Sequence, residues 1–345
     1  VAGVDRRPLD QRQQVALHAL PGDVGAADLA AGRDLVDLVE EHDAVVLDVG
    51  DRAQLDLLVV DQLGRLLVAQ QLHRLADPDL AGAPPPAHAL EQALQLGVID
   101  EISTDWAEAL DGAEIDLLAM PVGRTDAVAA AMAPHLGPDT LVTDAGSTKR
   151  DVIEAIYRHL AAHLPRVVPA HPIAGAEKSG PSAARADLYR KRKVVVTPLP
   201  ENDAVAVARV RELWAACGAH LFEMTPQEHD RVFAAVSHLP HLLAFGLVHD
   251  LAGRANAEEL FSYAASGFRD FTRVAGSHPE MWRDICLANR HSLLAELDAY
   301  LGELAWLRAL LASGDGPALE KVFSEASRAR NEWADKAFPA TPSGE

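Results

Sequence analysis

Five short apolar runs between residues 114 and 225 constrain the fold of this chain more than any other feature. They cover residues 114–122, 140–146, 165–172, 193–199 and 219–225. Stretches with helical spacing at 126–136, 149–164 and 202–217 separate several of them. Strands that alternate with helices predict a parallel sheet covered by helices on both faces. The runs are apolar throughout rather than alternating, which also indicates burial on both sides.

No further strand pattern follows residue 226, and the rest of the chain is predicted to be helical. Residues 227–251 are predicted to form a helix bent at Pro240, residues 279–313 a second helix and residues 317–338 a third. The second helix carries an apolar stripe made of Ile285, Leu293, Leu297, Leu301, Leu304 and Leu311. Such a stripe is typical either of a helical core or of a seam between two subunits. An all-helical second domain is therefore expected over residues 227–338.

Residues 1–98 have an unusual composition. They contain no Ile, Phe, Tyr, Trp, Met, Cys, Lys, Ser, Thr or Asn. Because these residue types supply caps, turns and core aromatics, the segment is expected to pack poorly, even with a helix at 29–41 and a strand at 44–49. One interpretation is a Leu-rich helical module. The other, which the composition favours, is a non-native segment, such as a shifted or opposite reading frame of G+C-rich DNA. The triple proline at 84–86 marks its end, so the predicted domains are 1–86, 87–226 and 227–338.

The charge and the cysteine content narrow the class of protein. The formal net charge is −20, which argues against non-specific binding to nucleic acid, because such binding requires clustered cations facing phosphates. No apolar run approaches the ~20 residues needed to cross a bilayer, and no signal-peptide pattern opens the chain. Cys217 and Cys286 make no disulfide framework. We expect a soluble, cytoplasmic protein that binds neither nucleic acid nor membranes.

Polar and glycine-rich residues follow three of the predicted strands. They lie at 120–123, 144–149 and 171–180, and open α/β sheets bind ligands at this carboxyl edge. Pro121, Val122 and Asp144 are therefore candidate cofactor-binding residues. Ser147 is either an ordinary helix cap or a ligand-binding residue, whose hydroxyl and neighbouring N–H groups would face the crevice at a positive helix terminus. His171 is either a buried structural histidine or a base.

In the helical domain, two pairs of polar residues have the spacing of one helix face. Ser237 and His241 are four residues apart, as are Arg269 and Arg273. Two phenylalanines flank the arginines, which favours a partly buried anion site over a solvated pair. His238 and His241 form a His-x-x-His pattern, but no Cys or acidic ligand recurs at fixed spacing, so no metal site is expected.

Five motifs occur in order along the chain: LVTDAGSTK, HPIAGAEKSG, VSHLPHLLAF, GFRDFTR and MWRDI. With them the chain resembles the prephenate dehydrogenase family over residues 87–338, nearly three quarters of its length. The resemblance implies an α/β, Rossmann-like domain followed by an all-helical dimerisation domain. It also implies hydride transfer to NAD, or to NADP, from the ring carbon that bears the 4-hydroxyl of prephenate. The ring carboxylate then leaves as CO2, giving 4-hydroxyphenylpyruvate in tyrosine, and so aromatic amino-acid, biosynthesis.

The resemblance also implies roles for individual residues. His171 matches the histidine that polarises or deprotonates the substrate hydroxyl, and Ser147 matches the serine that bonds this hydroxyl beside the nicotinamide. Arg273 matches the arginine that holds a substrate carboxylate. The rest of the pocket wall is matched by Glu177, Ser237, His241 and Arg269. Such a site would take prephenate or a similar small dicarboxylate, in a homodimer joined through the helical domain.

The chain departs from the family at the cofactor turn. The family begins with a strand and a G-x-G-x-x-G turn that cradles the dinucleotide pyrophosphate, and this sequence has no such turn. Residues 1–8 resemble the second strand of such a domain, with Asp5 in the place of the acidic residue that holds the adenosine ribose. We therefore expect weak NAD binding or none. Two alternatives stay open: an arogenate dehydrogenase, and a catalytically impaired dimeric module without a complete cofactor site.

Overall fold

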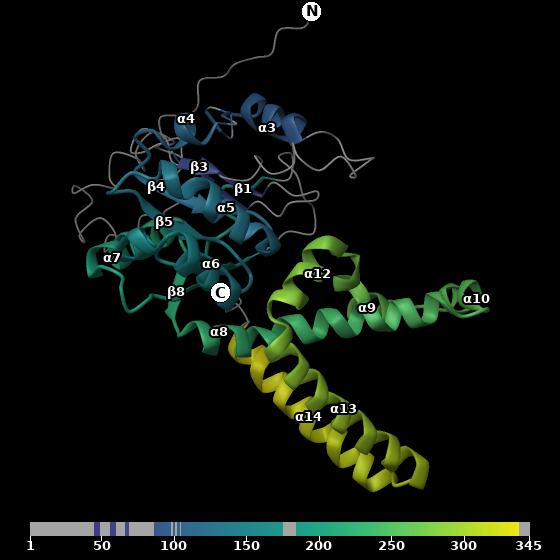
Figure 1. The fold of residues 1–345 in the computed structure, drawn as a ribbon. Coiled ribbons are helices and arrows are strands. Elements are labelled where there is room, and N and C mark those ends of the chain that lie inside the picture. The colour runs from purple at the N-terminus through teal and green to yellow at the C-terminus, as the bar shows by residue number, and fades with distance from the viewer. Residues whose placement is uncertain are drawn as a thin grey trace, which may run out of the picture. The chain divides into compact units, whose positions relative to one another are not determined.

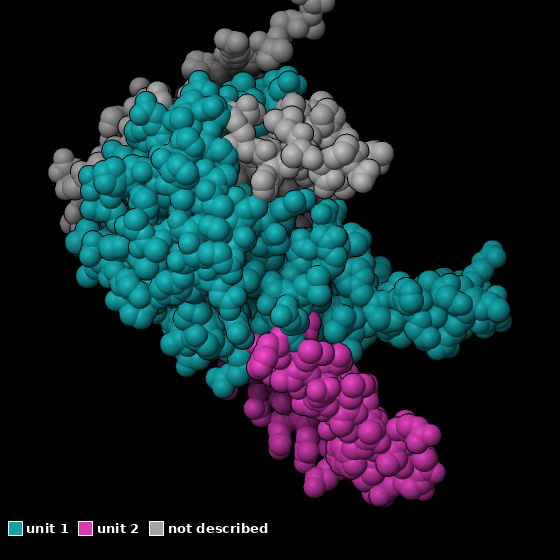
Figure 2. Space-filling view, in the orientation of Figure 1, with its two compact units in different colours: residues 1–290 teal, residues 291–345 magenta. Residues whose placement is uncertain are grey.

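Figure 1 shows the protein in a computed structural model that describes residues 45–48, 56–59, 66–68, 86–97, 99–100, 102–103, 105–174 and 184–337. The chain divides into two compact units, Val1–Arg290 and His291–Glu345 (Figure 2). The first contains all the described strands, and the described part of the second is helical. The predicted helix at 29–41, the strand-like residues 1–8 with Asp5, and Glu177 lie outside the described residues.

The described strands of the first unit form two three-stranded sheets and a separate pair. One sheet has the order β3 (Leu66–Val68), β4 (Ile115–Leu118), β5 (Leu141–Asp144), with all strands parallel. The other has the order β6 (Ala170–Ile173), β7 (Lys193–Val196), β8 (His220–Glu223). The separate pair is antiparallel and consists of β1 (Val45–Asp48), within the strand predicted at 44–49, and β2 (Asp56–Val59).

One strand departs from the predicted parallel arrangement. β6 runs antiparallel to β7, with His171 opposite Val195, whereas β7 and β8 are parallel. Parallel neighbours need a crossover connection, usually a helix, but residues 184–192, which lead into β7, form turns. Ahead of β6, Val167 makes a parallel bridge to Val142 of β5. The chain therefore passes alongside β5 and carries His171 just beyond its carboxyl end.

Helices cover the sheet formed by β4 and β5 on both faces. Leu118 and Val142 belong to a buried cluster with side chains of α5 (Thr125–Met132) and α6 (Arg150–His159). Leu117 and Leu141 belong to a second buried cluster with side chains of α7 (Ala204–Ala216). Because successive strand residues point to opposite faces, each strand serves both cores. This confirms the predicted burial on two sides for β4 and β5, whereas the prediction is wrong for β8, which is mostly exposed. The remaining elements of this part are α3 (Pro86–Gln95), α4 (Trp106–Leu110), η2 (Val122–Arg124), η3 (Ala133–His135) and η4 (Ala161–Arg166).

After β8 the described chain is helical, as predicted, but the helix boundaries differ. The first long helix consists of α8 (Pro226–Phe233), the π-helical segment η6 (Ala234–His238) and α9 (Leu239–Ala252). The irregularity ends two residues before Pro240, which has no backbone N–H to donate to the preceding turn of this helix. The shorter elements that follow are α10 (Ala257–Ser262), α11 (Ser266–Thr272) and η7 (Arg273–Gly276).

The single helix predicted at 279–313 is wrong. The structure has two helices there, α12 (Pro279–Ala288) and α13 (Arg290–Ser313), with Asn289 as the cap of the first. The side chain of Asn289 is buried and hydrogen-bonded, which holds the chain out of helical geometry at this point. The third predicted helix is α14 (Gly316–Ala337).

The continuous helix Pro226–Ala252 is the one described helix that is long and apolar enough to cross a membrane, judged by length and composition alone. Only 22% of its most apolar stretch is buried. The same helix also carries three buried polar residues, His229, Asp230 and His238.

Candidate active site

Asp144 and Lys149 close the turn that follows β5. The Asp144 carboxylate accepts hydrogen bonds at Oδ2 from the Gly146 backbone N–H (2.8 Å) and from Lys149 Nζ (2.5 Å). Its Oδ1 accepts a third from the backbone N–H of Ala170 at the start of β6 (3.0 Å). Asp144, predicted to bind the cofactor, thus bonds to groups of the protein and joins the ends of two strands.

The amino terminus of α6 is occupied by a carboxylate of the protein. The backbone N–H groups of Lys149 and Arg150 donate to Oδ1 and Oδ2 of Asp230, both at 2.9 Å. Gly146 N–H is bonded to Asp144, so the N–H groups of Gly146, Lys149 and Arg150 all have partners within the protein. The reason is long-range: Asp230 comes from α8 and satisfies the same donors that an external anion would use.

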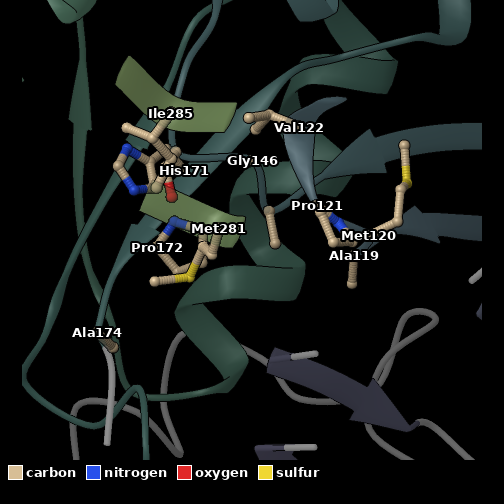
Figure 3. A pocket seen from close by; sticks show the side chains of 12 residues that line it. Ala119, Met120, Pro121, Val122, Gly146, His171, Pro172, Ala174, Met281 and Ile285 are labelled. Atoms are coloured by element: carbon tan, nitrogen blue, oxygen red, sulfur yellow. The ribbon is translucent and has the colours of Figure 1, made fainter. Parts of the chain in front are cut away.

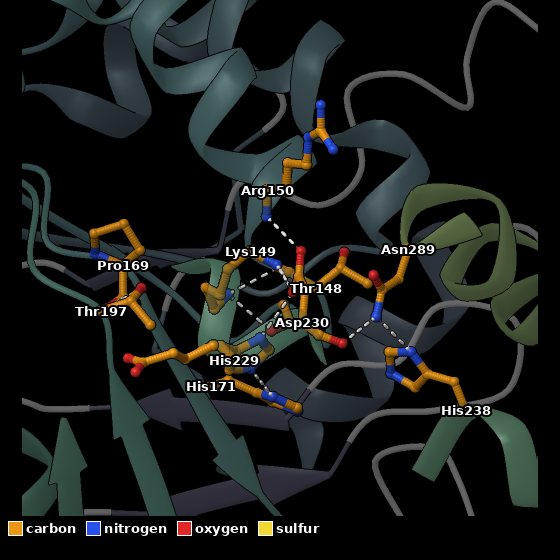
Figure 4. Close-up of polar contacts among 12 residues, drawn as sticks. Thr148, Lys149, Arg150, Pro169, His171, Thr197, His229, Asp230, His238 and Asn289 are labelled. Atoms are coloured by element: carbon orange, nitrogen blue, oxygen red, sulfur yellow. Dashed lines mark hydrogen bonds and ion pairs between the residues drawn. The ribbon is translucent and has the colours of Figure 1, made fainter. Parts of the chain in front are cut away.

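A chain of hydrogen bonds connects this helix terminus to His171 (Figure 4). Asp230 Oδ1 lies 2.8 Å from Nδ1 of His229, and Nε2 of His229 lies 2.7 Å from Nδ1 of His171. All three side chains are buried. Phe233 packs against both histidine rings, with ring centroids 5.0 Å from His171 and 4.5 Å from His229. We call Asp230, His229 and His171 the relay.

The relay determines the protonation of both histidine rings. Burial would raise the pKa of Asp230, but bonds from His229 and from the α6 N–H groups lower it, so it is a carboxylate. Burial lowers the pKa of His229, and burial together with the nearby His229, Lys149 and His238 holds the pKa of His171 well below 6.5. A neutral His229 that donates from Nδ1 must accept at Nε2, so His171 donates from Nδ1. The network therefore leaves the lone pair of His171 on Nε2.

Asn289 fixes a further histidine beside the relay. Its Nδ2 donates to the Asp230 carbonyl (2.7 Å) and lies 3.1 Å from Nδ1 of His238. Burial lowers the pKa of His238 to about 4, so its neutral ring accepts this bond at Nδ1. Among the described residues, no three His, Cys, Asp or Glu side chains are grouped as metal ligands.

A pocket opens at the strand ends (Figure 3). It is lined by Ala119, Met120, Pro121, Val122, Ala145, Gly146, Ser147, His171, Pro172, Ala174, Met281 and Ile285. Four of the predicted site residues are among them: His171, Ser147, Pro121 and Val122. The pocket lies beyond the carboxyl ends of β4 and β5, which is the usual ligand crevice of an open α/β sheet.

The predicted substrate-binding residues of the helical part form a separate group. His241 stacks on Trp282, with ring centroids 3.5 Å apart, and its Nδ1 lies 2.9 Å from the Ser237 carbonyl oxygen. The pKa of His241 is lowered, first by burial and then by the nearby charge of Arg273, although the bond to Ser237 raises it.

The two arginines do not form the partly buried anion site that the sequence predicts for a single chain. The side chain of Arg269 is 79% exposed and pairs with the adjacent Asp270. Arg273 is exposed as well. The helix α11 ends at Thr272, and Arg273 begins the tighter segment η7, so the four-residue spacing does not continue along one regular helix.

Sequence reasoning missed His229, Asp230, Lys149 and Asn289. A signal for His229 exists, because it stands four residues before Phe233 and so lies on the same, apolar face of α8. Asp230 has no such local signal, since the backbone N–H groups that it accepts from lie 80 and 81 residues away in the chain.

The fold and the site define an oxidoreductase built on a nucleotide-binding domain, with a neutral histidine at the crevice. The family models agree: the prephenate dehydrogenase nucleotide-binding domain matches residues 68–223, and the prephenate dehydrogenase dimerization domain matches residues 225–325. The chain belongs to the prephenate dehydrogenase family. The family match begins at residue 68, ahead of the motifs that carry the resemblance in the sequence.

Individual relatives agree with the family. The cyclohexadienyl dehydrogenase of Zymomonas mobilis is 39% identical over 241 residues, which cover 69% of this chain and 81% of the relative. The prephenate dehydrogenase of Bacillus subtilis is 36% identical, and the match covers 69% of this chain but only 65% of that enzyme. Among solved structures, A. aeolicus prephenate dehydrogenase with hydroxyphenyl propionate and NAD+ is 35% identical at a TM-score of 0.67, covering 71% of this chain and 86% of that one. Synechocystis arogenate dehydrogenase is 26% identical at a TM-score of 0.61, and the match covers 77% of this chain and 94% of that one.

Proposed function

We propose that the chain catalyses the NAD(P)+-dependent oxidative decarboxylation of prephenate to 4-hydroxyphenylpyruvate, a step of tyrosine biosynthesis. One observation carries this proposal: His171 lines the crevice of a nucleotide-binding domain with its Nδ1 bonded to His229, which leaves a basic Nε2. The A. aeolicus relative, solved with hydroxyphenyl propionate and NAD+, supports a small aromatic acid and a nicotinamide nucleotide as ligands.

His171 is suited to take the proton of the hydroxyl on the ring carbon that is oxidised. The carbon releases its hydride more readily as the hydroxyl oxygen gains negative charge. The two electrons of the C–H bond leave with the hydride, and the C–O bond becomes a carbonyl. The bond to the ring carboxylate then breaks and CO2 leaves, while its electrons make the ring aromatic and turn the carbonyl oxygen into a phenolate, which takes the proton back from His171. His171 holds the proton on Nε2 meanwhile, with its Nδ1 bonded to His229.

The strand ends fit the nicotinamide end of a cofactor. Pro121 and Val122 after β4 and Ser147 after β5 line the pocket beside His171, at the carboxyl ends of the strands where open α/β sheets bind ligands. When bound, the cofactor supplies the hydride acceptor. Ser147 would orient the substrate hydroxyl, and Asp144 would act indirectly by holding the turn. NAD is the proposed form, with NADP as the alternative, and Asp5 is the proposed ribose ligand.

The substrate wall is proposed to consist of Arg273, Ser237, His241, Arg269 and Glu177. Arg273 would hold a carboxylate, since a guanidinium offers charge and a fixed pair of donors. Its electrostatic effect on His241 supports placing the two residues in one pocket wall. Both arginines are exposed in the single chain, so we propose that a second copy covers them in a homodimer. The matched dimerization domain supports this arrangement.

We further propose that the enzyme works in the cytoplasm, and that the domain boundaries lie near residues 86 and 226. The boundary near 226 is supported by the end of one family match at residue 223 and the start of the next at 225.

A coupled pair of measurements tests the function. Purified protein is assayed for NADH and NADPH formation with prephenate and, separately, with arogenate, and NAD+ binding is measured by calorimetry. Turnover of prephenate supports the proposal, whereas turnover of arogenate alone points to the arogenate enzyme. NAD+ binding without turnover of either substrate, or no detectable heat at all, favours the impaired dimeric module.

A further inference from the structure

Lys149 lies beneath the pocket, and the proposed reaction gives it no task. Its side chain is fully buried. Its Nζ donates to Asp144 Oδ2 at 2.5 Å, to the Gly146 carbonyl at 2.8 Å and to the Thr148 carbonyl at 3.1 Å. An ammonium group has three N–H donors, so these acceptors use all of them. Burying a charge is costly unless it is paired and hydrogen-bonded in this way.

The bonds of Lys149 fix the shape of the turn that carries Ser147. The carbonyls on either side of Ser147 accept from Nζ, and Ser147 itself lines the pocket. The backbone N–H of Lys149 donates to Asp230, the first member of the relay. One residue thus connects the Ser147 turn to the residues that hold His171.

We propose that Lys149 is a positioning residue of this site: its ammonium group closes the turn that presents Ser147 and holds a fixed positive charge beside the His171–His229 pair. The proposal rests on the proposed function in one respect only, that His171 is the base.

The charge of Lys149 favours the neutral form of His171. Burial is the first reason that the pKa of His171 is low, and repulsion by His229, Lys149 and His238 lowers it further. The same ammonium lowers the pKa of His229, whereas Asp230 and Asp144 raise it. Among the described residues, these groups come from the end of β5 and the start of α6 (Asp144 and Lys149), from α8 (His229 and Asp230) and from η6 (His238). Because a base must be unprotonated, the fixed charge keeps His171 ready to accept a proton.

The test compares Lys149→Met, which removes the charge, with Lys149→Arg, which keeps it. The pH at which His171 protonates is followed by NMR in protein labelled at the histidine rings, with the His171 signal identified by its loss in His171→Asn. We expect Lys149→Met to move this titration upward by about one pH unit and Lys149→Arg to leave it near the wild-type position. Lys193→Met, which removes an exposed lysine on β7, is the matched control and should change nothing.

The proposal also predicts the direction in which the pH dependence of kcat changes. Activity that needs neutral His171 is lost as pH falls through its pKa, so Lys149→Met should move the acid limb of kcat to higher pH. A folded Lys149→Met protein in which His171 titrates at the wild-type pH overturns the proposal, and so does an equal shift in Lys193→Met.

The NMR measurement needs neither substrate nor cofactor, so it can fail or succeed independently of the proposed function. If Lys149→Met does not fold, the double variant Asp144→Asn/Lys149→Met takes its place, because it leaves no unpaired buried charge. An upward shift of the His171 titration in the double variant supports the proposal, and a titration at the wild-type pH overturns it.

Discussion

The Nδ1 atom of His171 lies 2.7 Å from Nε2 of His229, and this contact decides which ring atom of His171 can serve as a base. The neutral His229 donates its one N–H, on Nδ1, to Asp230 at 2.8 Å, so its Nε2 can only accept. His171 therefore donates through Nδ1 and keeps its lone pair on Nε2. A carboxylate and a second histidine together orient the ring and set its tautomer, which a single buried histidine could not do.

His171→Asn tests this base directly. Asparagine retains a polar side chain but cannot take up a proton, so we expect kcat to fall by roughly 10²–10⁴ with little change in KM. Initial rates of NADH formation measure the effect. His220→Asn, at an exposed histidine on β8, is the matched control. Unchanged turnover in His171→Asn removes this residue from the mechanism.

Asp230→Asn tests the far end of the relay. The amide cannot accept all three bonds that the carboxylate accepts from His229, Lys149 and Arg150. A lost bond to a charged group is worth about 1.5–3 kcal/mol. We expect kcat to fall roughly 10- to 150-fold and the denaturation midpoint to drop.

The matched control for Asp230→Asn is Asp126→Asn, which removes an exposed carboxylate paired with Arg158 on the surface. Exposed pairs contribute about 0–1 kcal/mol, so little change is expected. A loss of stability in Asp230→Asn without any loss of kcat would mean that Asp230 only caps α6.

The sheet and its covering helices could be predicted because the buried strands are mostly apolar and bounded by polar turns. The antiparallel β6 could not, since a strand's direction depends on its connection and leaves no mark on its own residues. The break at Asn289 was hidden for a related reason. Helical apolar spacing continues on both sides of it, and only the buried bonds of Asn289 to Asp230 and His238 reveal the interruption.

The relay shows that residue spacing in the sequence cannot predict contacts between residues that are remote in the chain. His171 was found because it ends a strand, which is a local feature. Its partner His229 lies 58 residues further along, and no periodicity links a strand end to a helix face at that distance. The carboxylate of Asp230 at the first turn of α6 could not be predicted for the same reason, because it is 81 residues away from Lys149 in the chain.

Arg273→Ala tests the proposed carboxylate ligand. Losing a charge-assisted bond should raise KM for prephenate roughly 10- to 150-fold while kcat changes far less. Steady-state kinetics at several substrate concentrations measure both. Arg254→Ala, at an exposed arginine paired with Asp250, is the matched control. If KM barely moves, the carboxylate is held elsewhere, and Arg269 is the next residue to change.

The second unit is predicted to form a dimer interface. Its two long helices leave large apolar side chains exposed, among them Leu301, Leu304, Trp306, Leu311, Phe323 and Trp333. Exposed apolar residues gathered on one helical pair are typical of a subunit contact. We expect light scattering at micromolar concentration to give a dimer mass, and Leu304→Glu/Leu311→Glu to shift it toward the monomer. The control Val205→Glu adds the same charge at an exposed apolar residue of α7. A monomeric wild-type protein contradicts the prediction.

Asp116 is predicted to make the stability of the protein depend on pH. It lies within β4, is 1% exposed, and neither carboxylate oxygen has a hydrogen-bond partner among the described residues. Burial raises its pKa from 3.8 to about 7. The folded state therefore binds a proton that the unfolded chain releases between these values. Below about pH 4 ionisation of this residue takes nothing from the free energy of unfolding. As pH rises from 4 to 7 the free energy of unfolding falls, and above pH 7 the loss stays constant.

Asp116→Asn should remove this cost, because the amide has the shape of the protonated acid and cannot ionise. The expected gain in unfolding free energy is at most about 4 kcal/mol at pH 8 and close to zero at pH 4. Urea denaturation of wild type and variant at both values measures it. Asp111→Asn, at an exposed residue that follows α4, should give no such difference between the two pH values. An equal effect of Asp116→Asn at pH 4 and pH 8 would show that Asp116 is paired in the folded protein, because only an unpartnered carboxylate gains from losing its charge.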